Sequence, residues 1–101
     1  MDKERLENIR KMETVLNEMT SAVEDMQRAT DRWGELMPRY KELFRYYSEG
    51  DWMEDHDAAS RGEIPEGMSH GVLTEDAVYD LYSDQHFLAI RLIKLALEIL
   101  E

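Results

Sequence analysis

The sequence contains no cysteine, which excludes disulfides, thiolate metal sites and cysteine nucleophiles. A chain without cysteine fits the reducing conditions of the cytoplasm. The sequence also lacks a long uncharged apolar run, because Arg91 and Lys94 interrupt its most apolar stretch at about residues 87–100. The charged first residues lack the apolar core of a signal peptide. We therefore expect a cytoplasmic protein with no membrane partner.

Basic side chains are scarce in the middle of the chain. Residues 49–85 hold eleven Asp and Glu but one base, Arg61, so this segment carries −10 of the net charge of −11. Such a field repels the phosphates of nucleic acids, and we expect no nucleic-acid partner. Two interpretations of the acids stay open: a solvated face that keeps the protein soluble, or a surface for a basic protein partner.

Apolar residues recur with a heptad period from residue 9 to residue 47. Two neighbouring rows begin with the residues that we expect to form an interaction surface: Ile9, Met12, Leu16, Met19, Val23 and Met26. These rows continue through Thr30, Trp33, Met37, Tyr40, Phe44 and Tyr47, and a flanking row holds Val15, Ala22, Ala29, Leu36 and Leu43. Three apolar positions in seven are typical of a core-facing bundle helix or a broad coiled-coil seam. The pattern predicts one amphipathic helix over about residues 3–47.

Gly34 and Pro38 lie inside this predicted helix. A proline clashes with the carbonyl four residues back, and here that residue is a glycine without a side chain. Because the heptad phase continues unchanged across both residues, we predict a kink near residues 34–38 and no loop.

The segment of about residues 48–73 is predicted to be irregular and acidic, since five glycine or proline residues follow the long helix. Within it, Asp51 and Glu54 resemble a capping pair and predict a short helix over about residues 51–60. Thr74 resembles an N-cap for a short helix over about residues 75–82.

Ser83 and Asp84 offer a second cap, which predicts a separate C-terminal helix over about residues 85–100. That helix is apolar on nearly every side and needs neighbours around it. The predicted fold is therefore an all-α helical bundle in a single domain, residues 1–101. It has one long kinked N-terminal amphipathic helix, short middle helices and an apolar C-terminal helix.

The predicted lengths do not match. A helix over residues 3–47 is about 67 Å long, whereas the last helix covers about 24 Å. Either the long helix folds back sharply at Gly34 and Pro38, or a second copy of the chain covers its stripe. We expect a homodimer.

Two stretches, YYSEGDWMED and GVLTEDAVYDLY, together with the apolar C-terminal helix, resemble a small bacterial family catalogued as domain of unknown function 4298. The distinctive positions are Trp52, Met53, Glu54, Asp55, Gly71, Val72, Leu73, Glu75, Asp76, Ala77, Tyr79 and Asp80. The resemblance implies a short, stand-alone, cytoplasmic helical protein. It implies no particular activity.

Acidic residues in the middle segment are candidate ligands for a divalent cation, because hard cations bind several oxygens. The candidates are Asp51, Glu54, Asp55, His56, Asp57, Asp76 and Asp80. The spacing does not match an EF-hand, since Met53 stands at the second ligand position. The simpler interpretation is that these acids form a solvated surface.

Aromatic residues gather near the end of the long helix: Tyr40, Phe44, Tyr47 and Trp52. They predict either a small-molecule pocket or a hydrophobic plug between helices. In the second case, Asp76 or Asp80 would accept a hydrogen bond from Tyr40 or Tyr47.

No catalytic motif is present: the sequence has no phosphate-binding glycine loop and no nucleophile beside a base. We therefore expect no cofactor and a protein–protein interaction or self-assembly module. The alternative is a divalent-cation-binding protein or a Mg-dependent enzyme of phosphate chemistry that uses residues 49–85.

Overall fold

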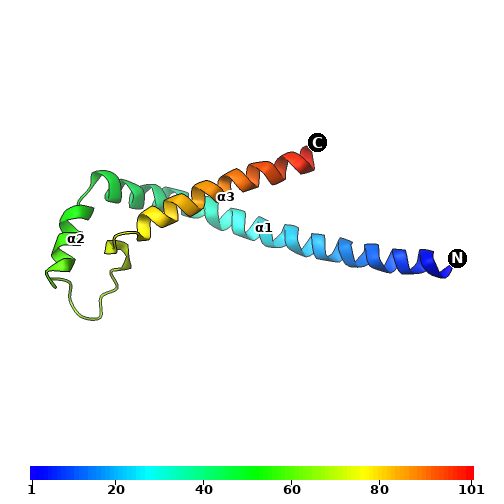
Figure 1. Cartoon of the computed structure of the whole chain (residues 1–101), viewed down its shortest axis with the longest axis horizontal. Helices are drawn as coiled ribbons and strands as arrows, with labels where there is room; N and C mark the ends of the chain where they lie inside the picture. The colour runs from blue at the N-terminus through cyan, green and yellow to red at the C-terminus, as the bar shows by residue number, and fades with distance from the viewer. The chain divides into compact units, whose positions relative to one another are not determined.

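A computed structural model describes all 101 residues of the chain and contains helices but no strands. In chain order the elements are α1 (Lys3–Glu49), α2 (Trp52–Ser60), a 3-10 turn η1 (Gly71–Leu73) and α3 (Ala77–Leu100) (Figure 1). The all-α class and the long N-terminal helix are confirmed. None of the helices is both long enough and apolar enough to span a bilayer.

Helix α1 runs through Gly34 and Pro38 without a break, so no loop interrupts it and it does not fold back there. Its 47 residues give a length of about 70 Å. A Cβ added at Gly34 would meet nothing within 4 Å, so close packing does not require glycine at this position. The kink itself stays a prediction.

Both ends of α1 have a local cause. At the start, Asp2 Oδ1 accepts a 2.8 Å hydrogen bond from the backbone N–H of Arg5, which is the geometry of an N-cap. At the end, the N–H of Gly50 donates to the carbonyl of Tyr46 at 3.1 Å. A Cβ at Gly50 would lie 2.9 Å from that carbonyl oxygen, so a residue without a side chain is needed for the chain to turn into α2.

The predicted division of the C-terminal region is wrong. Helix α3 is continuous from Ala77 to Leu100, and Ser83 and Asp84 lie inside it. A serine or an aspartate costs little in a helix interior, and the apolar residues on both sides of the pair continue with helical spacing. The separate helices predicted over about residues 75–82 and 85–100 are therefore one element.

The two side-chain caps predicted at Thr74 and Asp51 are also absent. Thr74 does not cap α3; its hydroxyl donates to the Gly71 carbonyl at 2.6 Å and closes the η1 turn. Asp76 precedes α3 without a side-chain capping bond. The predicted short helix over about residues 51–60 is confirmed as α2, although Asp51 makes no side-chain capping bond either.

Contacts divide the chain into two units, Met1–Arg39 and Tyr40–Glu101. The prediction of a single domain stays a prediction. The first unit is helix alone, and every residue from 1 to 32 in it is exposed. The second unit contains the three buried apolar residues of the chain, Trp52, Leu73 and Val78. This small core holds α2, η1 and the start of α3 together.

Candidate functional site

Trp52 is the centre of the second unit. It is the first residue of α2, and only 6% of its surface is exposed. Its indole Nε1–H donates to the carbonyl oxygen of Val72 in η1 at 2.8 Å, and the rings of Tyr47 and Trp52 pack in a T-shaped arrangement with centroids 5.0 Å apart. A buried indole needs an acceptor for its N–H, and the η1 turn supplies one.

His56 lies one helical turn after Trp52, and the two rings stack with centroids 4.8 Å apart and 10° between planes. The imidazole Nδ1 is 2.6 Å from the carbonyl oxygen of Leu73. Because a carbonyl only accepts hydrogen bonds, Nδ1 carries the hydrogen. His56 therefore joins Trp52 in anchoring η1 to α2, through two successive backbone carbonyls.

Tyr46, in the last turn of α1, donates from its hydroxyl to Asp55 Oδ2 in α2 at 2.6 Å. Burial of the hydroxyl and the neighbouring Asp55 carboxylate raise the pKa of Tyr46 from 10.0 to about 12. The phenol therefore remains a protonated donor over the physiological range. This bond crosses the Gly50 turn and sets α2 against the end of α1.

Aromatic rings also line the contact between the end of α1 and the start of α3. Phe44 of α1 and Tyr82 of α3 stack with centroids 5.1 Å apart. Tyr40 and Tyr47 lie 6.2 Å and 6.4 Å from Phe44, and His86 continues the series beside Tyr82 at 6.4 Å. Pairs at these distances stabilise packing beyond their buried area.

The hollows near these rings do not enclose a ligand. One is lined by Tyr40, Lys41, Phe44, Arg45, Ser48 and Glu49, and the other by Glu42, Arg45, Tyr46, Glu49 and Gly50. Each set comes from the end of α1 and the residue after it, so neither hollow has an opposite wall. Ligand pockets bury most of the surface of a small molecule. These two hollows therefore give no support to a small-molecule pocket, whereas the rings do pack against one another.

The candidate cation ligands are not gathered into one site. Nowhere in the chain do three or more His, Asp or Glu side chains converge as a metal would require. Asp55 and His56 are engaged by Tyr46 and by the Leu73 carbonyl. The other candidates are exposed: Asp51, Glu54, Asp57, Asp76 and Asp80.

The family-like positions divide into two groups. Trp52 and Asp55 belong to the packed centre described above. The remaining predicted positions are exposed: Met53, Glu75, Asp76, Tyr79 and Asp80. The tyrosine–acid hydrogen bond lies between Tyr46 and Asp55, and not at the pairs expected from the sequence.

Sequence reasoning missed three contributors: Tyr46, Tyr82 and the carbonyl acceptors of η1. The i,i+4 spacing of Trp52 and His56 was a signal for their stacking, since such residues share a helix face. No sequence signal gave the partner of Tyr46, because it depends on the direction of the chain after Gly50.

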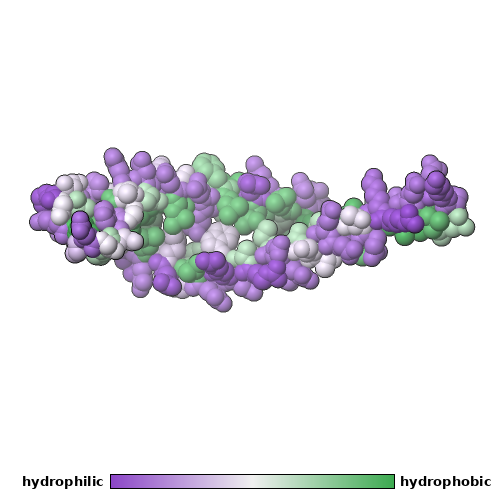
Figure 2. Space-filling view, turned by 90° about the horizontal axis from the view of Figure 1, so that it is seen from below, coloured by the Kyte–Doolittle hydropathy of each residue, from purple (hydrophilic) through white to green (hydrophobic).

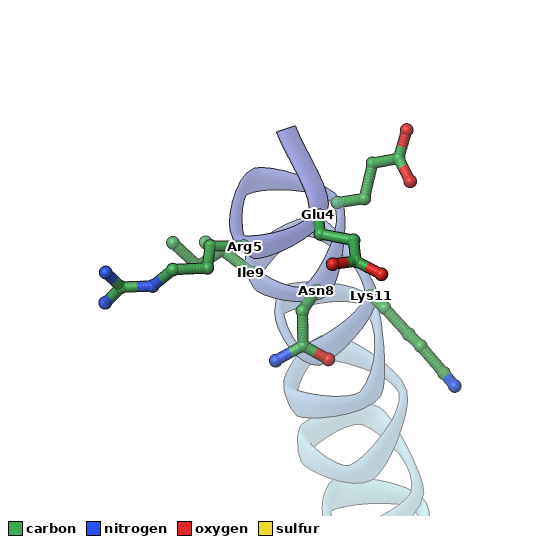
Figure 3. A pocket seen from close by; sticks show the side chains of 6 residues that line it. Glu4, Arg5, Asn8, Ile9 and Lys11 are labelled. Atoms are coloured by element: carbon green, nitrogen blue, oxygen red, sulfur yellow. The ribbon is translucent and has the colours of Figure 1, made fainter. Parts of the chain in front are cut away.

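The predicted interaction surface lies on the N-terminal part of α1. Its six members are between 47% and 58% exposed: Ile9, Met12, Leu16, Met19, Val23 and Met26. Figure 2 shows scattered green, apolar atoms among purple, polar ones along the N-terminal part of α1, at the right of the view. A hollow at the first turns is lined by Ile9 with Arg5, Asn8 and other residues of the same helix, whose side chains spread around it (Figure 3).

The sequence of the chain was compared with those of known proteins, and one family matches it. No curated protein and no solved structure matches the chain. The sequence model of one family, described as Domain of unknown function (DUF4298), matches residues 9–95. The match spans α1 from Ile9 onward, the Trp52 centre and most of α3. The chain therefore belongs to the DUF4298 family.

Proposed function

We propose that this protein is a self-associating helical module, in which a second copy covers the N-terminal part of α1. The observation that carries the proposal is the exposed apolar stripe of residues 6–26. It is supported by a limit on how far the rest of the chain can reach, by the energetics of burial and by the poor stability of a lone helix.

The reach of α3 is limited by its contact with α1. Tyr82 stacks on Phe44, and from Tyr82 to Leu100 the helix rises about 27 Å. The same rise along α1 from Phe44 ends near Met26. Along the continuous helix α1, α3 therefore does not reach the stripe from Leu6 to Val23, and α2 spans only about 13 Å. Only another molecule can bury these side chains.

The area of the stripe is sufficient for association. Eight residues between positions 6 and 26 are 44–58% exposed: Leu6, Ile9, Met12, Val15, Leu16, Met19, Val23 and Met26. Completing the burial of a half-exposed side chain of this kind contributes about 1 kcal/mol. Two copies together would gain about 16 kcal/mol, against a cost of association of about 4–15 kcal/mol.

Residues 3–32 have few interactions that would stabilise them as an isolated helix. The ion pair between Asp25 and Arg28 is largely exposed and contributes little. The hydroxyls of Thr14 and Thr20 bond to the carbonyls four residues back, which does not favour the helix. Helical stability in proteins comes chiefly from packing of the apolar face, so a partner would stabilise this part of α1.

The test is the mass of the untagged protein in solution, by light scattering and native mass spectrometry at micromolar concentration. We expect a dimer. Leu16→Glu places a charge in the stripe and should weaken the dimer at least tenfold. Asn17→Glu adds the same charge on the outer face and should leave the dimer intact. A cooperatively folded wild-type monomer would overturn the proposal.

The compartment is part of the same proposal: a chain without cysteine and with no membrane-spanning helix suits the cytoplasm. The alternative of a cation-dependent enzyme is not proposed, because no group of three ligands converges in the chain.

A further inference from the structure

We infer that the two copies pair antiparallel along α1, with Leu16 opposite Met19 of the second copy. This inference rests on the proposed self-association and adds its geometry. It is carried by three features of residues 3–32: the composition of the two seam rows, the asymmetry of the flanks and the distribution of charge. All of these residues are exposed and free to meet a second chain.

The two seam rows differ in kind. Between residues 9 and 26, one row holds the branched residues Ile9, Leu16 and Val23, and the other holds Met12, Met19 and Met26. In an antiparallel pair each row faces the other row, which gives the layers Ile9–Met26, Met12–Val23 and Leu16–Met19. Methionine is unbranched and adapts to the shape of a branched neighbour. A parallel pair in register would instead stack methionine on methionine in every second layer.

The two flanks of the seam differ as well. Val15, Ala22 and Ala29 lie on one side, whereas Glu13, Thr20 and Gln27 lie on the other. In an antiparallel pair each flank lies beside the same flank of the second copy, so the apolar flanks of the two helices bury each other. In a parallel pair the apolar flank would lie against Thr20 and Gln27 of the second chain. Flanking positions of this kind set the orientation of paired helices.

Charge favours the same orientation. Residues 3–17 contain four basic and three acidic side chains, and residues 18–32 contain two basic and four acidic ones. The first half therefore carries +1 and the second half −2. An antiparallel pair that joins Leu16 to Met19 sets each half against its opposite, whereas a parallel pair sets −2 against −2. Opposed charges guide pairing and like charges disfavour it.

Spin labels can measure the orientation, because the natural chain has no cysteine and a single added one is labelled selectively. Glu7 and Glu18 are exposed and lie outside the three apolar rows. In the antiparallel pair, position 7 is level with residue 28 of the second copy, so two labels at Glu7→Cys are about 31 Å apart along the axis. Labels at Glu18→Cys are level with each other and separated by the width of the helix pair, about 20 Å.

The experiment is pulsed dipolar spectroscopy on each labelled full-length variant, with its mass measured in the same buffer. A distance above about 30 Å at Glu7→Cys with a short distance at Glu18→Cys supports the inference. Short distances at both positions mean a parallel pair and overturn the inference, while self-association stands.

Three other outcomes have separate meanings. A dimer without a short distance at Glu18→Cys places the second copy elsewhere and overturns the inference. A labelled variant that is monomeric while the wild type is dimeric puts the outer face in the interface, which also overturns it. A monomeric wild type overturns the proposed function, and the inference with it.

Discussion

The hydroxyl of Tyr46 and the carboxylate of Asp55 lie 2.6 Å apart across the turn at Gly50. They are nine positions apart in sequence, and their bond ties the last turn of α1 to the first turn of α2. Across the same turn, the rings of Tyr47 and Trp52 pack in a T-shaped arrangement. The last turn of α1 is thereby joined to the small core of the second unit.

Tyr46→Phe should destabilise the second unit. The substitution keeps the ring but removes a hydrogen bond to a charged acceptor, so we expect a loss of about 1–2 kcal/mol in the free energy of unfolding. Urea denaturation followed by circular dichroism measures it. Tyr79→Phe removes a hydroxyl from a residue that is 58% exposed and is the matched control. Equal stability of the two variants would show that the Tyr46–Asp55 bond contributes nothing.

Stability should fall as alkaline solutions ionise Tyr46. Its pKa rises from 10.0 to about 12, first because the hydroxyl is buried and then because Asp55 accepts its hydrogen bond. The folded state therefore holds the proton more tightly, so the stabilisation is complete below pH 10 and is lost as pH rises toward about 12. Urea midpoints measured between pH 8 and pH 12 should decline, and the decline should be smaller in Tyr46→Phe. The same decline in both proteins would contradict the assignment to Tyr46.

Replacing Gly34, inside α1, and Gly50, directly after α1, by alanine should change the stability in opposite directions. A Cβ at Gly34 meets nothing within 4 Å, so Gly34→Ala should stabilise the helix by about 0.5–1 kcal/mol. A Cβ at Gly50 lies 2.9 Å from the Tyr46 carbonyl oxygen, so Gly50→Ala should destabilise by about 1–3 kcal/mol. Melting temperatures of the two variants, compared with wild type at one protein concentration, test both signs. A stabilising Gly50→Ala would mean that the turn has another geometry.

Removal of divalent cations should leave the protein unchanged. Three ligands converge nowhere in the chain, and we predict that the acids of residues 49–85 form a solvated surface. We expect the same melting temperature with and without a chelator, and no more effect of Mg²⁺ than of NaCl at equal ionic strength. A chelator-dependent fall of several degrees would reveal a specific site and would revive the metal-binding alternative.

The long helix was predictable because its signal is local: apolar residues with one period over more than five heptads can be buried only on one face of a helix. The continuity of α3 through Ser83 and Asp84 was not predictable. Capping residues are also tolerated inside helices, and only the packing of their neighbours decides whether they end a helix or lie within it. The helix α2 was predicted at its correct place although its expected side-chain cap is absent.

Less of the packed centre could be predicted. The aromatic residues were identified by type and position, and the four do pack in series: Tyr40 with Phe44, Phe44 with Tyr47, and Tyr47 with Trp52. The acceptors of Trp52 and His56 are backbone carbonyls of η1, about twenty residues away, and their location depends on how residues 61–70 return the chain. Backbone acceptors leave no mark in a sequence, since every residue carries one.

Trp52→Phe tests whether η1 depends on this anchor. The variant keeps an aromatic ring against Tyr47 but loses the N–H that donates to the Val72 carbonyl at 2.8 Å, so this part-buried hydrogen bond is lost. We expect a loss of about 1–3 kcal/mol and faster amide exchange at Leu73 and Thr74, whose N–H groups close the η1 turn. Met53→Ala, on the next residue of α2 and 62% exposed, should change the stability by less than about 0.5 kcal/mol. If exchange at η1 is unaffected in Trp52→Phe, the turn is held by its own hydrogen bonds, and the Trp52 centre does not organise the segment between α2 and α3.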